Sequence, residues 1–114
     1  MKSETAVLRL SALAQSSRLA LFRLLVRRGP DGLCVGDIAA KLKLAPATLS
    51  FHLKELTRAG LLQARQDGRF IFYTANYKAM NELLAYLTEN CCGGEPCGIE
   101  SAIAPTARSC DVTP

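Results

Sequence analysis

Apolar residues recur with helical spacing along most of the chain and predict five helices separated by short polar segments. The first helix is expected over residues 4–14. The second begins after Ser16 or Ser17, because either hydroxyl can cap a helix. The motif GPDG at residues 29–32 ends this second helix, since glycine and proline both interrupt helical structure.

The third and fourth predicted helices lie close together in the sequence. Residues 35–42 predict a short helix, and Pro46 begins the next one, because the first helical turn tolerates proline. The fourth helix is expected over residues 46–59, where leucines at i, i+4 and i+7 define a buried face: Leu49, Leu53 and Leu56. Two helices joined by a short turn are the unit that many proteins use to place a helix in the DNA major groove.

A β-hairpin is predicted for LLQARQDGRFIFYTA, residues 61–75, because Asp67–Gly68 is a preferred two-residue turn between alternating strands. A fifth helix follows, with an apolar stripe of Tyr77, Met80, Leu83, Leu84 and Leu87. The expected fold is mainly α with a β-hairpin wing, a winged helix-turn-helix of five helices. Residues 1–90 are expected to form this domain, and residues 91–114 a flexible tail that contains cysteines.

Charge is divided unevenly along the 114 residues. Residues 1–78 contain 13 Lys and Arg against 5 Asp and Glu, a formal charge of +8. Residues 79–114 contain 1 against 5, a formal charge of −4. A basic body favours a polyanionic partner such as nucleic acid, although an ordinary solvated surface accounts for the charge alone equally well.

The apolar runs and the cysteines bear on the compartment. No run is long enough for a membrane span, and charged and polar groups interrupt the first 18 residues, so a cytoplasmic location is expected. Five cysteines, an odd number with two adjacent, favour metal binding or redox chemistry over disulfides. An enzyme is not expected, because a cysteine nucleophile needs a nearby base and His52 is the one histidine.

The segments LSALAQSSRLALFRLL and LCVGDIAAKLKLAPATLSFHLKELTRAGLLQARQDGRFIFY resemble the ArsR/SmtB family of metal-responsive repressors, over roughly residues 6–88. SFHLKELTRAGLL and RQDGRFIFY are the most specific parts. The resemblance implies a homodimer whose first and last helices form the interface. It also implies binding to a palindromic double-stranded operator and release when a metal or metalloid binds. The apolar candidates for the interface are Leu10, Leu83, Leu84 and Leu87.

The fourth helix and the wing supply the candidate DNA contacts. A helix that enters the major groove needs outward donors, which Ser50, Lys54 and Arg58 provide. Thr48 can bond a phosphate or a base, whereas the aromatic Phe51 must pack on a thymine methyl or a sugar. The remaining candidates are His52, in a structural or phosphate-contacting role, Arg69 at the wing tip, and Arg65 on the adjoining strand.

The inducer is predicted from the cysteines. The family's arsenic pattern CVCDLC is reduced here to CVGDIA, which keeps only Cys34, and the last helix lacks the histidines of the family's zinc site. Some family members carry an arsenic site near the end of the last helix. Here ENCCGGEPCG places three thiols in that position, and we expect them to bind arsenite, As(III): Cys91, Cys92 and Cys97.

Two other uses of these thiols stay open. A thiolate site completed by Cys110 suits cadmium, lead or zinc, and the vicinal pair suits the sensing of oxidants or persulfides. Organic arsenicals are a further form of the arsenic ligand. Cys110 is expected to be a spectator at the arsenic site, and Cys34 an inert, half-buried residue.

Overall fold

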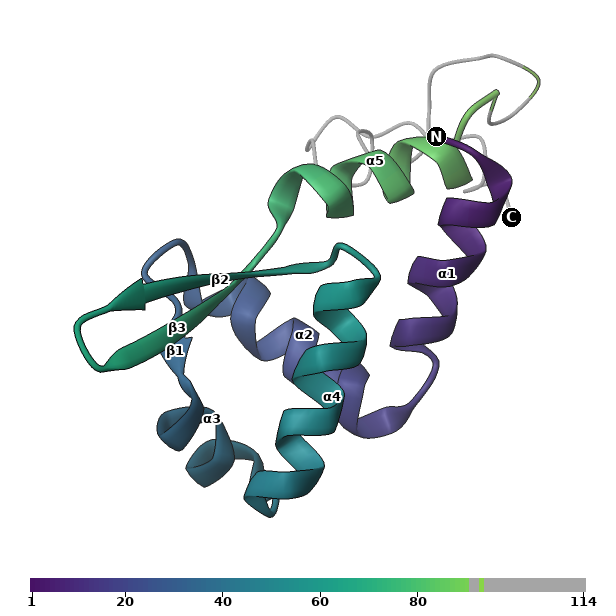
Figure 1. The fold of residues 1–114 in the computed structure, drawn as a ribbon. Helices are drawn as coiled ribbons and strands as arrows, with labels where there is room; N and C mark the ends of the chain where they lie inside the picture. The colour runs from purple at the N-terminus through teal and green to yellow at the C-terminus, as the bar shows by residue number, and fades with distance from the viewer. Residues whose placement is uncertain (91–92, 94–114) are drawn as a thin grey trace.

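The computed structural model describes residues 1–90 and 93. Its helices and strands are α1 (Ser3–Leu13), α2 (Ser16–Arg28), β1 (Leu33–Cys34), α3 (Val35–Leu42), α4 (Pro46–Arg58), β2 (Leu62–Asp67), β3 (Phe70–Ala75) and α5 (Tyr77–Leu87). The β2–β3 hairpin extends from one side, and α1 and α5 lie together on the other (Figure 1). The predicted winged helix-turn-helix with five helices is confirmed.

The core lies between α2, α3, α4 and the start of the hairpin. Its fully buried side chains are large and aliphatic: Leu21, Leu25, Ile38, Leu49, Leu56 and Leu61. The predicted leucine face of α4 is buried, since Leu53 is only 3% exposed and the other two leucines are completely covered. Burying one such side chain contributes roughly 1.5–3 kcal/mol. The leucines therefore fix which side of α4 faces the solvent.

The ends of α2 agree only in part with those predicted from the sequence. The helix is capped by Gln15, whose side-chain oxygen accepts a hydrogen bond from the Arg18 N–H at 2.9 Å. The expectation that Ser16 or Ser17 caps it was therefore wrong, because the preceding glutamine reaches the free N–H first. At the other end the helix stops at Arg28, and Gly29 adopts a φ of 94°, as the GPDG motif predicted.

The hairpin turn lies one residue later than predicted. Asp67 pairs with Phe70, so the two-residue turn is Gly68–Arg69 and not Asp67–Gly68. Gly68 has a φ of 66°, and glycine is favoured at the first turn position of a type II′ hairpin. This register places Leu62 opposite Ala75, and both side chains are buried.

A third strand, β1, was not predicted. It pairs antiparallel with β3 through Leu33 opposite Tyr73 and Cys34 opposite Phe72, which makes β3 the central strand. Gly32 precedes it with a φ of 72°, and a Cβ there would lie 2.5 Å from the Tyr73 carbonyl oxygen. Only glycine allows the chain to approach β3 this closely.

Candidate nucleic-acid interface

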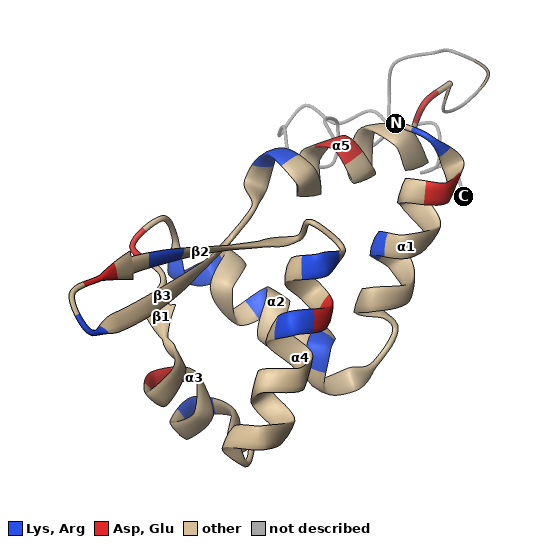
Figure 2. Ribbon diagram, in the orientation of Figure 1, with Lys and Arg blue, Asp and Glu red and all other residues tan. Residues whose placement is uncertain are grey.

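The solvent-exposed face of α4 carries the polar side chains that the sequence predicted. Because the leucines occupy the opposite side, the five predicted side chains are all exposed: Thr48, Ser50, Phe51, Lys54 and Arg58. Figure 2 shows basic residues on this helix and at the tip of the hairpin. Phe51 is 54% exposed, which is unusual for a phenylalanine and leaves its ring free to contact a ligand.

Arg58 is partly engaged by its own helix. Its Nη2 donates to the Glu55 carboxylate at 2.7 Å, while the Arg58 side chain keeps 64% of its exposure. Exposed i,i+3 pairs of this kind contribute only a few tenths of a kcal/mol. Arg58 can therefore exchange Glu55 for a stronger partner.

His52 lies beneath the exposed face and not on it. Its side chain is only 6% exposed, and its Nδ1 lies 3.4 Å from Nη1 of Arg18. The pKa of His52 is lowered, first by burial and second by the charge of Arg18. Of the two roles expected for His52, this position favours the structural one over the phosphate-contacting one, because a neutral, buried imidazole cannot reach a phosphate.

The two wing arginines differ in their surroundings. Arg69 is exposed in the turn at the tip. Arg65 lies over the Phe72 ring, 5.2 Å from its centroid, and donates to the Asp31 carbonyl at 3.3 Å. Sequence reasoning missed the exposed apolar pair beside the turn, Phe70 and Ile71, which are 59% and 43% exposed. Their position directly after the predicted turn could have indicated that these two side chains are exposed.

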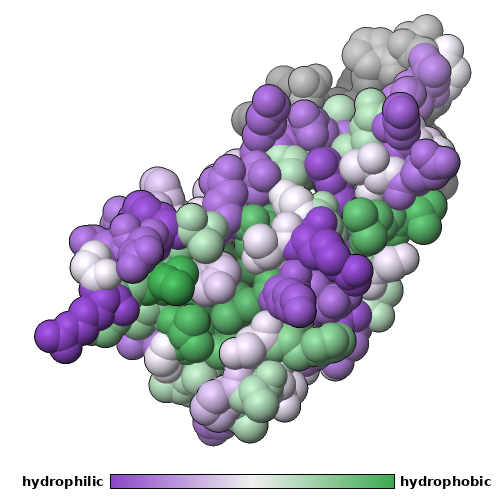
Figure 3. Space-filling view, in the orientation of Figure 1, coloured by the Kyte–Doolittle hydropathy of each residue, from purple (hydrophilic) through white to green (hydrophobic). Residues whose placement is uncertain are grey.

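Apolar surface gathers on α1 and at the end of α5. Leu10 is 41% and Leu87 53% exposed, and Val7 and Leu8 extend the same kind of surface on α1. Figure 3 shows this apolar surface over α1. Leu84 is half-buried, but Leu83 is 5% exposed and packs within its own chain, so it offers little area to a partner.

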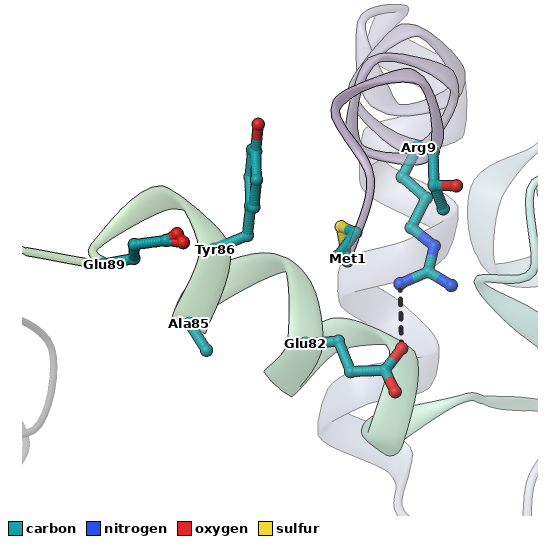
Figure 4. Close-up of a pocket in the computed structure, with 7 residues that line it drawn as sticks. Met1, Arg9, Glu82, Ala85, Tyr86 and Glu89 are labelled. Carbon is teal, nitrogen blue, oxygen red and sulfur yellow. Dashed lines mark hydrogen bonds and ion pairs between the residues drawn. The ribbon is translucent and has the colours of Figure 1, made fainter.

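A cleft of about 390 Å³ separates α1 from the second half of α5. Figure 4 shows Arg9 crossing from α1 to Glu82 on α5 at 3.3 Å. The same guanidinium donates to the Ala79 carbonyl at 3.1 Å. Arg9 thus ties the first helix to the last.

The described residues contain one cysteine, and it is not part of a metal cluster. Cys34 is half-buried and its Sγ donates to the Asp37 carboxylate at 3.4 Å. Residues 1–90 and 93 hold no group of three or more His, Cys, Asp or Glu side chains placed to bind a metal ion. The predicted ligands Cys91, Cys92 and Cys97, and also Cys110, lie outside the described residues. Within the described part, no helix is long and apolar enough to cross a membrane.

The short helix pair, the hairpin wing and the polar outer face of α4 define a winged helix-turn-helix DNA-binding protein. A family profile described as a helix-turn-helix domain matches residues 13–63. Two curated relatives are each more than 30% identical, with more than two thirds of their length covered. The chain belongs to the ArsR/SmtB family of transcriptional regulators, and the prediction that it is not an enzyme is confirmed.

One relative is the transcriptional activator HlyU of Vibrio cholerae serotype O1, 38% identical over 85 residues, covering 72% of this chain and 76% of HlyU. The solved structure of HlyU from Vibrio cholerae N16961 is 36% identical, with a TM-score of 0.59, covering 76% of this chain and 97% of that one. A second HlyU structure, described as reduced, is 38% identical with a TM-score of 0.58, covering 75% and 90%.

Two further proteins are similar to this chain, one in sequence and one in fold. The arsenical resistance operon repressor of Bacillus subtilis is 35% identical over 81 residues, covering 71% of this chain and 73% of that protein. A homodimeric winged helix-turn-helix domain from Mycobacterium bovis matches in fold, with a TM-score of 0.63 at 24% identity, covering 75% and 77%. DNA binding and homodimerisation are typical of the family.

Proposed function

We propose that the chain is a repressor that binds operator DNA and is released when As(III) binds Cys91, Cys92 and Cys97. The observation that carries this proposal is the sequence after α5, where three cysteines fall within seven positions among glycines. Thiolates are soft ligands, and trivalent arsenic takes three sulfurs in a pyramid. The likeness to the arsenical resistance operon repressor supports this choice of inducer.

DNA is bound, in this proposal, by the outer face of α4 and the wing tip. Lys54 and Arg58 supply positive charge on the helix, and Arg69 supplies it at the tip. Thr48, Ser50 and Phe51 add hydrogen bonds and an apolar contact. Each phosphate neutralised by Lys or Arg releases counterions, so DNA affinity falls steeply as salt rises. Arg65 contributes less, because it already stacks on Phe72 and donates to Asp31.

The subunits pair, in this proposal, through α1 and α5. Leu10 and Leu87 supply exposed apolar area, and Leu84 borders it. Arg9 joins α1 to the first half of α5 through Ala79 and Glu82, so a movement of α5 as a whole also reaches α1. As(III) must bind the DNA-free form more tightly than the DNA-bound form, because only differential affinity shifts the equilibrium.

The test follows release of a fluorescent operator duplex by arsenite, measured as anisotropy, in five single variants. Cys91→Ser, Cys92→Ser and Cys97→Ser are expected to bind DNA like the parent but to resist release. Cys34→Ser and Cys110→Ser are the matched controls and should release normally. Unimpaired release from the Cys91→Ser/Cys92→Ser double variant would refute the three-thiol site and return attention to Cys34.

A second candidate is a thiol-redox switch at the same cysteines. It is favoured by the likeness to HlyU, one structure of which is described as reduced. Adjacent thiols are open to oxidation when one of them is a reactive thiolate. In the same assay, hydrogen peroxide replaces arsenite. Release by peroxide, reversed by dithiothreitol and absent in Cys91→Ser, combined with no response to arsenite, would favour this function.

A further inference from the structure

One half-buried guanidinium connects three helices beside the proposed DNA-binding face of α4. Arg18, on α2, donates from Nε to the Ala12 carbonyl in the last turns of α1 at 2.7 Å. Its Nη1 lies 3.4 Å from Nδ1 of His52 on α4. The Ala12 bond is short, and the His52 contact is longer than an ordinary hydrogen bond. Ala12 itself is buried in the core, where α1 packs against α4.

The chemistry of the pair fixes one protonation state. An arginine side chain has only N–H donors, so Nδ1 of His52 must accept and the ring proton resides on Nε2. Burial and the Arg18 charge both oppose protonation of this ring. The imidazole is therefore a neutral acceptor held against a fixed cation.

The position of His52 makes this contact important for DNA reading. It follows Phe51 directly, with ring centroids 5.8 Å apart, and lies one turn before Leu56 on the buried side of α4. Ser50, Phe51 and Lys54 surround it in sequence and form the proposed DNA face. A rotation of α4 about its axis would move His52 away from Arg18. The same rotation would move Ser50, Phe51 and Lys54 away from the DNA major groove in the proposed complex.

We infer that Arg18 is a positioning residue for DNA recognition: it holds the rotation of α4 relative to α1 without touching DNA. This rests on the proposed DNA face of α4. α1 carries the apolar surface proposed to meet the partner subunit, so the same guanidinium fixes the recognition helix to the helix that pairs the subunits. Base contacts need this alignment, whereas phosphate contacts tolerate more displacement.

The experiment compares two labelled duplexes of equal length, using the full chain. One is selected by the parent protein from a randomised library, and the other is a scrambled sequence. Arg18→Gln is expected to weaken binding to the selected duplex about tenfold, because a charge-assisted bond no longer favours the aligned orientation of α4. Binding to the scrambled duplex and the salt dependence should not change, because no phosphate contact is removed. Arg18→Lys, which keeps one charged donor, should recover part of the loss.

Two controls separate positioning from other roles. Arg23→Gln removes an exposed arginine from the same helix and should leave both duplexes bound as by the parent. Lys54→Gln tests the proposed DNA face independently, and should weaken both duplexes and reduce the salt dependence. Thermal unfolding and sedimentation of every variant report the folded, dimeric fraction, by which each affinity is corrected. If Arg18→Gln does not fold, binding to the selected and scrambled duplexes is compared with Arg18→Lys and His52→Gln in its place.

The inference is overturned if the loss is equal on both duplexes, or if it vanishes after correction for the folded fraction. A salt slope reduced by about one would also overturn it, since Arg18 would then be a phosphate contact. An unchanged Lys54→Gln variant would instead contradict the proposed face of α4. The two failures are thus distinguishable.

Discussion

Replacing Glu55 with glutamine is expected to strengthen DNA binding. Glu55 accepts a hydrogen bond from Arg58 at 2.7 Å, and the two side chains are 24% and 64% exposed. An exposed pair of this spacing contributes about 0.3–0.5 kcal/mol, whereas an arginine that reads a base contributes about 1–3 kcal/mol. We therefore expect Arg58 to leave Glu55 when DNA binds. Breaking the Glu55–Arg58 pair then weakens DNA binding by the free energy that the pair contributes.

The magnitude follows from two contributions. Without the Glu55–Arg58 pair to break, the free energy of DNA binding becomes more favourable by about 0.4 kcal/mol. For an assumed separation of roughly 8 Å between Glu55 and the nearest phosphate, removing the negative charge favours binding by about 0.5 kcal/mol in water. The total of about 1 kcal/mol corresponds to an affinity gain of about fivefold.

The assay is fluorescence anisotropy at one fixed salt concentration with Glu55→Gln, Arg58→Gln and the double variant. Glu55→Gln should bind about fivefold more tightly, and Arg58→Gln more weakly than the parent. In the double variant the gain from Glu55→Gln should be smaller, because only the charge contribution remains. Weaker binding by Glu55→Gln, at an unchanged thermal midpoint, would refute the reasoning and show that Glu55 orients Arg58 for DNA.

Three further changes test other parts of the structure. Leu87→Asp places a charge on the exposed apolar surface of α5 and should shift sedimentation toward the monomer; an unchanged dimer would exclude this surface from the interface. The lowered pKa of His52 means that the unfolded chain binds more protons, so the free energy of unfolding should fall as pH drops below about 6.5. In denaturant melts at several pH values, His52→Gln should lose less stability at low pH than the parent. The same pH dependence in both proteins would contradict a lowered pKa of His52. Gly32→Ala should destabilise the fold by roughly 2–4 kcal/mol in the same melts, because the new Cβ meets the Tyr73 carbonyl at 2.5 Å, while Gly36→Ala should not.

The helices were predictable because their signals are local and repeated. α3 has the predicted bounds, and α4 differs by one residue. The leucine spacing predicts most of the buried face of α4. It also determines, by exclusion, the exposed residues of the candidate DNA interface.

The missed features depend on contacts between distant residues. β1 is two residues long, too short for a periodic signal, and its partner Tyr73 lies 40 residues away. His52 is at the edge of the leucine stripe, and it is buried beside Arg18, 34 residues earlier. The turn was predicted one residue too early because Asp-Gly and Gly-Arg both suit a two-residue turn. Burial of Leu62 opposite Ala75 decides between the two registers.

The pairing of β1 with β3 supports only the base of the wing, so we expect the base and the tip to open at different rates. β1 meets β3 only at Phe72 and Tyr73, so in the described chain the stretch from Gln66 to Ile71 has backbone partners only within the hairpin. Amide protons near the base should exchange with solvent slowly, and those near Arg69 quickly, because opening the tip disturbs no third strand. In the proposed DNA complex, the tip can then adjust to the duplex while the base keeps its place on the domain.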